Sequence, residues 1–83
     1  MPTISQYNLE AIAAAQAGGW ERAHEIVMQH EDVLSCWIHA VVHKIEGDVG
    51  NSRYWYARTS HVYVDFVDVA EELAAIKKMA GKI

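Results

Sequence analysis

The stretch WIHAVVHKIEGDVGNSRYWYAR, residues 37–58, decides the prediction of the fold. Its first half places apolar residues three or four positions apart, at Ile38, Val41 and Ile45, which is the spacing of one helix face. Two glycines then occur in GDVGN, which is typical of a turn. A second helix is expected after this turn. The stretch therefore predicts two helices joined by a short connection that contains glycine.

The same two signals, helical spacing of apolar residues and glycine stops, predict the helices on either side of this stretch. We expect helices over residues 5–17, 20–30, 32–46, 51–60 and 62–80, with N-caps at Ser5, at Asp32 and at Asn51 or Ser52. The last of these helices has acidic residues early and lysines late, which suits the helix dipole. The segment HVYVDFV in it alternates like a strand but has no second strand to pair with, so it is expected to be helix or connector. The prediction is an all-α domain of about five helices.

Two parts of the chain resemble each other at an offset of 29 residues, which pairs Gly18 with Gly47. Each copy reads as a helix, a glycine turn and a second helix. Each also has two small residues twelve positions apart, which would let antiparallel helices approach closely. These residues are Ala11 and Ala23 in the first copy, and Ala40 and Ser52 in the second. We therefore expect two stacked helix hairpins in a single domain over residues 1–83, with the C-terminal helix capping the open end.

The turns GGW and GDV, each followed by a small residue and then a large one four positions later, resemble the tetratricopeptide type of helical repeat. The small and large residues are Ala23 and Val27 in the first copy and Ser52 and Tyr56 in the second. The resemblance covers about residues 7–60. The period is 29 where the repeat usually has about 34, and the closing proline is missing. The resemblance implies a helix-pair scaffold that binds partners rather than a catalyst.

Residues 43–58 are also similar to a group of small uncharacterised helical proteins that carry an LHRxEGDxxNAxYWYxRA stretch. In this chain Lys44 stands in place of the arginine, Ser52 in place of the first alanine and Thr59 in place of the last. This resemblance implies a recurring structural unit and no particular reaction.

The composition limits the classes of function. A single cysteine excludes a disulfide within the chain and fits a reducing, cytoplasmic setting. The net charge of −4 and the lack of a basic stripe argue against nucleic-acid binding, and no apolar run approaches the roughly 20 residues of a membrane span. The first nine residues do not resemble a signal peptide. Because 52% of so short a chain is apolar, we expect part of its surface to meet a second copy, as a homodimer, or another protein.

The third predicted helix, over residues 32–46, carries a stripe of potential metal ligands. Cys36, His39, His43 and Glu46 recur at spacings of three and four, so a helix would place them on one face. His39 and His43 are one turn apart and could both reach one divalent metal ion of the zinc type. His24 from the preceding helix and Glu46 are the candidates for further ligands, as in metal sites inside helix bundles.

The same stripe can also be interpreted as packing. A helix that is apolar on one face and carries Cys36, His39 and His43 on the other could be buried on both sides. Each imidazole would then be neutral and hydrogen-bonded, with a pKa below the usual value of about 6.5. This interpretation needs no cofactor and favours a protein-interaction or self-assembly module. The alternative is a small metal-binding protein or metal-dependent enzyme that uses the histidine stripe.

Two other groups of side chains bear on function. Cys36 is not predicted to be catalytic, because Glu31 and Asp32 nearby would raise the pKa of its thiol. No other catalytic residue is predicted. The aromatic residues Tyr54, Trp55 and Tyr56 could stack on a ligand ring. We expect this triplet to split, with Trp55 turned inward and Tyr54 or Tyr56 at the rim.

Overall fold

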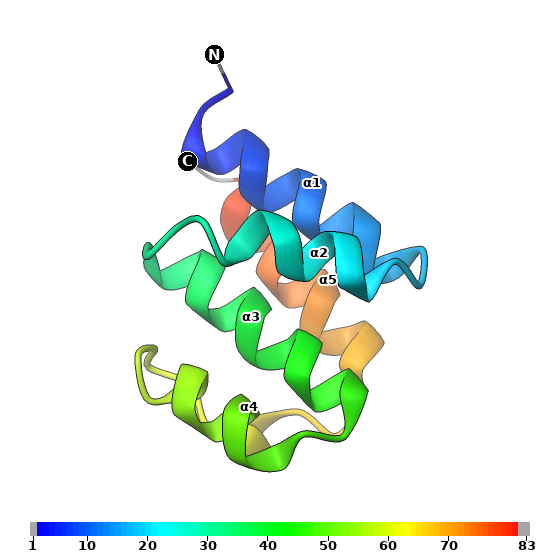
Figure 1. Cartoon of the computed structure of the whole chain (residues 1–83), viewed down its shortest axis with the longest axis vertical. Helices are drawn as coiled ribbons and strands as arrows, with labels where there is room; N and C mark the ends of the chain where they lie inside the picture. The colour runs from blue at the N-terminus through cyan, green and yellow to red at the C-terminus, as the bar shows by residue number, and fades with distance from the viewer. Residues whose placement is uncertain (1, 82–83) are drawn as a thin grey trace.

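The computed structural model describes residues 2–81, which form five α-helices and one short 3-10 helix and contain no strand. The elements are α1 (Ile4–Gln16), α2 (Trp20–Val27), α3 (Val33–Glu46), α4 (Val49–Tyr56), η1 (Tyr63–Asp65) and α5 (Val69–Ala80). The prediction of an all-α domain with about five helices is confirmed. Helices α1 to α4 follow one another down the long axis of the molecule, and α5 lies behind them, against α1 and α3 (Figure 1).

Helix pairs α1/α2 and α3/α4 make the most extensive contacts in the molecule. The small residues predicted at these contacts are all fully buried: Ala11, Ala23, Ala40 and Ser52. In the second pair the Ser52 hydroxyl donates a hydrogen bond of 2.6 Å to the Ala40 carbonyl. This short bond requires the two backbones to approach closely. The side chain at position 52 must therefore be small.

Helix α3 is the centre of the fold. It packs against α1, α2, α4 and α5, and every residue from Ser35 to Val42 is buried. Its N-terminus is fixed by Asp32, whose side chain accepts a hydrogen bond of 3.1 Å from the Ser35 amide and one of 3.3 Å from Asn8. The predicted cap at Asp32 is therefore confirmed. Because α3 is buried on both faces, its polar residues must find partners inside the protein.

Two other predicted helix starts are wrong. Helix α1 begins after Thr3 rather than at Ser5, because Thr3 and Gln6 form a reciprocal capping box with hydrogen bonds of 3.1 and 2.7 Å. Helix α4 begins after Asp48, whose carboxylate accepts a hydrogen bond from the Asn51 amide. The predicted cap at Asn51 or Ser52 is therefore three or four residues late. A strong capping side chain directly after a glycine turn lets α4 start early, with a glycine inside its first turn.

Helix α4 ends at Tyr56, four residues before the predicted end at residue 60. The predicted helices over 20–30 and 62–80 are also shorter than expected. The former ends at Val27. The latter begins only at Val69, after the N-cap Asp68, and residues 62–68 form η1 and extended backbone. The Lys44 ammonium donates to two backbone carbonyls of this connector, which holds it out of a regular helix. The HVYVDFV segment is therefore a connector, one of the two structures that its pattern allowed.

Gly47 ends α3 in the left-handed conformation, with φ +81°, and Gly18 has φ +86° after α1. A Cβ at position 47 would meet nothing within 4 Å, so only backbone strain opposes a side chain there. We expect Gly47→Val to lower the free energy of unfolding by about 1–2 kcal/mol in chemical denaturation. Gly50→Ala is the matched control, because Gly50 has equal space but lies in α4, where alanine is neutral or stabilising. Equal effects of the two substitutions would contradict this assignment.

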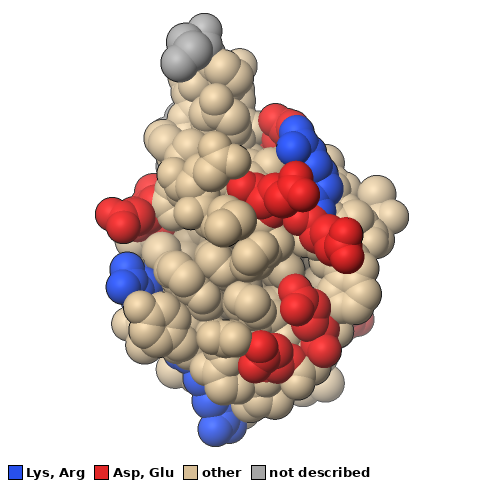
Figure 2. Space-filling model, viewed as in Figure 1, with Lys and Arg blue, Asp and Glu red and all other residues tan. Residues whose placement is uncertain are grey.

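The surface carries charges of both signs. On the face shown in Figure 2, basic side chains lie at separate places with acidic ones between them, and they form no continuous stripe. None of the helices within residues 2–81 is long and apolar enough to span a membrane.

Candidate functional site

Three histidines from two helices meet at one point. His24 lies on α2, and His39 and His43 lie one turn apart on α3. Each offers one ring nitrogen such that the three nitrogens all lie within 4.8 Å of one another. Zinc binds imidazole nitrogens at about 2.0–2.1 Å, which places tetrahedral ligands roughly 3.4 Å apart. The observed limit of 4.8 Å is wider than this spacing, so the side chains would have to move closer together to bind one ion.

The rings of this histidine cluster (His24, His39 and His43) are packed against one another. The His24 ring lies edge-on to both others, at centroid distances of 4.7 Å from His39 and 5.2 Å from His43. The His39 and His43 rings are stacked at 5.0 Å. The i to i+4 spacing on α3 aligns the last two, and the packing of α2 on α3 adds the first. The sequence prediction that His24 joins the other two is therefore consistent with the geometry.

His39 is the buried member of the cluster, with 4% of its surface exposed. Burial lowers the pKa of its imidazole from 6.5 to about 4, and the neighbouring His24 and His43 add to this effect. The ring is therefore neutral at pH 7, which is the form that binds metal. In the absence of metal, the stability that His39 contributes is full above pH 6.5 and is lost as the pH falls from 6.5 towards 4.

His43 has an unsatisfied polar atom. Its Nδ1 is buried and has no hydrogen-bond partner among the residues that the structure describes. The nearest carboxylate oxygen is Oε2 of Glu46, 4.0 Å away, which is too far for a hydrogen bond. The packing interpretation expects a hydrogen bond at each ring nitrogen, and this atom has none among the described residues. A buried imidazole nitrogen without a partner is unfavourable unless something else binds it.

Trp55 forms one wall of the histidine cluster. Its ring stacks on the His39 ring at a centroid distance of 3.9 Å and an interplanar angle of 13°. Tyr54 is 54% exposed, whereas Tyr56 is buried and its hydroxyl hydrogen-bonds inside the protein. The aromatic triplet is split and Tyr54 lies at the rim, but the innermost ring is that of Tyr56, whereas Trp55 is only half-buried. The Tyr54 and Trp55 rings contact each other edge-on, with centroids 5.1 Å apart, whereas the Tyr56 ring is buried in the protein.

Cys36 does not belong to the histidine cluster. Its thiol lies 3.6 Å from the Glu31 carbonyl oxygen. Burial raises the pKa of this thiol, and the charges of Asp32 and Glu31 raise it further, while Arg58 opposes them. The sulfur is therefore a protonated, buried thiol. Of the predicted stripe, His39 and His43 meet, together with His24 from α2, whereas Cys36 and Glu46 lie outside the histidine cluster.

A second polar cluster, which the sequence did not predict, surrounds Glu72. This residue is fully buried on α5. Its Oε2 accepts hydrogen bonds from Trp37 Nε1 at 2.8 Å and from the Tyr56 hydroxyl at 2.6 Å. Its Oε1 accepts from Lys44 Nζ at 3.0 Å. Burial and the bond to Glu72 raise the pKa of the Tyr56 hydroxyl, which stays protonated.

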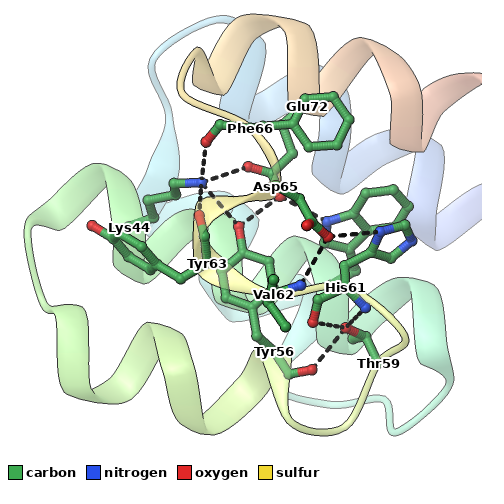
Figure 3. Close-up of polar contacts among 10 residues, drawn as sticks. Lys44, Tyr56, Thr59, His61, Val62, Tyr63, Asp65, Phe66 and Glu72 are labelled. Carbon is green, nitrogen blue, oxygen red and sulfur yellow. Dashed lines mark hydrogen bonds and ion pairs between the residues drawn. The ribbon is translucent and has the colours of Figure 1, made fainter.

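Lys44 extends this cluster to the connector. Its ammonium also donates hydrogen bonds of 2.8 Å to the carbonyls of Tyr63 and Phe66, as Figure 3 shows. We call Glu72, Lys44, Tyr56 and Trp37 the buried hub. The hub joins α3, α4, η1 and α5. Its polar groups are occupied by one another, so it is a structural centre and has no free group for a ligand.

The sequence contained one signal for the hub. Glu72 stands four positions before Ile76 and three after Val69, on the apolar side of α5. Its place in an acidic run favoured a solvated position.

No family model, curated protein or solved structure matches this chain.

Proposed function

We propose that this protein binds one divalent transition-metal ion of the zinc class through His24, His39 and His43. The observation that carries this proposal is the convergence of three imidazoles from two helices, with ligand atoms within 4.8 Å of one another. The buried and unpaired Nδ1 of His43 supports it, because a cluster built only for packing would satisfy that atom.

Imidazole ligands favour zinc, copper, nickel and related ions over magnesium and calcium, which prefer oxygen. Glu46, close to His43 and partly exposed, is the candidate for a fourth ligand. With Glu46 bound, the site would have the four protein ligands of a structural zinc centre. With Glu46 turned away, a water molecule would take the fourth position, as in catalytic zinc sites.

Titration of the untagged chain with Co²⁺ tests the proposal. Tetrahedral Co²⁺ has strong visible absorption, so we expect a spectrum that saturates at one ion per chain. His39→Gln combined with His43→Gln should abolish it. His30→Gln is the control, because His30 packs on Tyr7 and is outside the cluster. Absence of stoichiometric binding in the native chain, or binding that survives in the double variant, would contradict the proposal.

We also propose that the chain self-associates, and that it acts in the cytoplasm, where its single thiol would stay reduced. Three valines of the connector support self-association: Val62, Val64 and Val67 are 55%, 73% and 99% exposed. The sequence alone favours the C-terminal helix or the segment 54–56 as the contact, whereas the exposed valines favour this connector. Sedimentation at micromolar concentration should show a dimer, and Val64→Asp with Val67→Asp should give a monomer. A native chain that stays monomeric at every concentration tested would contradict self-association.

A further inference from the structure

A pocket of about 450 Å³ lies where the end of α4 meets the connector. Its lining is mainly apolar and includes Tyr56, Val62, Tyr63 and Val64, with Arg53 at its wall. The rings of Tyr56 and Tyr63 stand nearly perpendicular, with centroids 6.1 Å apart. The volume is within the usual range for a small-molecule site, and the pocket shares no residue with the histidine cluster.

The walls of the pocket are held by hydrogen bonds. The buried hub fixes Tyr56 through its hydroxyl and Tyr63 through its carbonyl (Figure 3). The Thr59 hydroxyl lies 2.8 Å from the Tyr56 carbonyl and accepts a hydrogen bond of 3.0 Å from the His61 amide. The His61 ring stacks on Trp37 at 3.7 Å. A ligand would therefore enter a preformed pocket and would not have to order a loose loop.

Arg53 provides an uncompensated charge. Its guanidinium lies 5.5 Å from the centre of the Tyr63 ring, and no carboxylate within residues 2–81 forms an ion pair with it. Arg22 is by contrast paired with Glu10 at 3.0 Å. The imidazole of His61 is already 3.6 Å from the Asp65 carboxylate. The pocket thus combines apolar walls, the partly exposed Tyr63 ring and one guanidinium without an ion pair, which can bind a carboxylate through two hydrogen bonds.

We propose that this pocket binds a small carboxylic acid with an aromatic body. The ring of the ligand packs against Tyr63 and the valines beside it, and its carboxylate pairs with Arg53. This site is independent of the metal site, so either proposal can fail without the other. It shares Val62 and Val64 with the surface proposed for self-association, so ligand binding and dimer formation would compete.

The probe is 3-phenylpropionate, with neutral 3-phenylpropionamide as the matched ligand, and binding is followed by amide chemical shifts of the native chain. We expect the acid to bind about tenfold tighter than the amide, because only the acid forms a charge-assisted pair with the guanidinium. The shifted amides should be those of residues 53–64. Arg53→Gln should remove the tenfold preference for the acid.

Arg58→Gln is the control. Arg58 is also an exposed arginine near the end of α4, but it does not line the pocket, so the preference should persist. Ala57→Trp, at an exposed lining position, should weaken both ligands by filling the pocket. Equal affinity for acid and amide in the native chain, equal effects of the two arginine variants, or shifts confined to residues outside 53–64 would overturn the proposal.

Discussion

Lys44→Met is expected to lower the free energy of unfolding by about 3–5 kcal/mol, the typical effect of removing one partner of a buried ion pair. The Lys44 side chain is 8% exposed and that of Glu72 is fully buried. Without the ammonium, the Glu72 carboxylate keeps its hydrogen bonds from Trp37 and Tyr56 but loses its counter-charge. The carbonyls of Tyr63 and Phe66 also lose their donor. Urea denaturation followed by far-ultraviolet circular dichroism measures the change.

The double variant Lys44→Met with Glu72→Gln separates charge from packing. A glutamine at position 72 is neutral, and its amide oxygen can still accept from Trp37 and Tyr56. We therefore expect the double variant to be more stable than Lys44→Met alone. Lys77→Met is the control for loss of a surface lysine, since Lys77 is exposed, and should change stability by less than about 0.5 kcal/mol. A Lys44→Met effect as small as that of Lys77→Met would show that the ion pair is not buried in solution.

Zinc is expected to raise the free energy of unfolding of the native chain by about 2.7 kcal/mol when free zinc is at 100 times its dissociation constant. The three histidines are brought together only in the folded chain, so zinc binds the folded state and shifts the equilibrium towards it by mass action. His39→Gln should lose most of this gain, and His30→Gln should keep it. A chelator added to the zinc-loaded native chain should return it to the stability of the metal-free chain. A native chain whose denaturation midpoint is unchanged by both zinc and chelator would contradict metal binding.

The stability of the metal-free protein at acidic pH, measured with chelator present, provides a second test of the histidine cluster. Between pH 6.5 and about 4 the unfolded chain protonates His39 while the folded chain does not. Its contribution to stability is therefore present at pH 7.5 and partly lost at pH 5.5. His39→Gln should reduce this loss. Because chelator is present throughout, displacement of metal by protons cannot explain it.

The helix ends that depend on neighbouring residues in the chain could be predicted from the sequence. Glycines with left-handed backbone end α1 and α3 where the sequence indicated, because no other residue adopts that conformation as easily. The connector over 62–68 was not separated from α5, because its apolar residues continue the helical spacing. What removes it from the helix is Lys44, which lies about twenty positions earlier in the chain. A contact of that range leaves no trace in a local pattern.

The histidine cluster and the buried hub also differ in how far a local sequence pattern can predict them. His39 and His43 are aligned by helical spacing alone, so the sequence could predict that they share a face. The hub cannot be predicted from the local pattern, because Glu72 lies in an acidic run, which favours a solvated position. Its burial depends on Trp37, Lys44 and Tyr56, which come from two other helices. Only the packing of α5 against α3 reveals that a carboxylate at this position has three donors.

The hub also bears on how the chain folds during synthesis. Trp37 and Tyr56 donate to a residue that follows them by 35 and 16 positions. Until Glu72 has left the ribosome, these donors and the Lys44 ammonium have no acceptor within the native structure. The first four helices can form and collapse earlier, but their final packing must wait for α5. A nascent chain that ends before Glu72 is therefore expected to remain sensitive to protease, and resistance should appear in one step once α5 emerges.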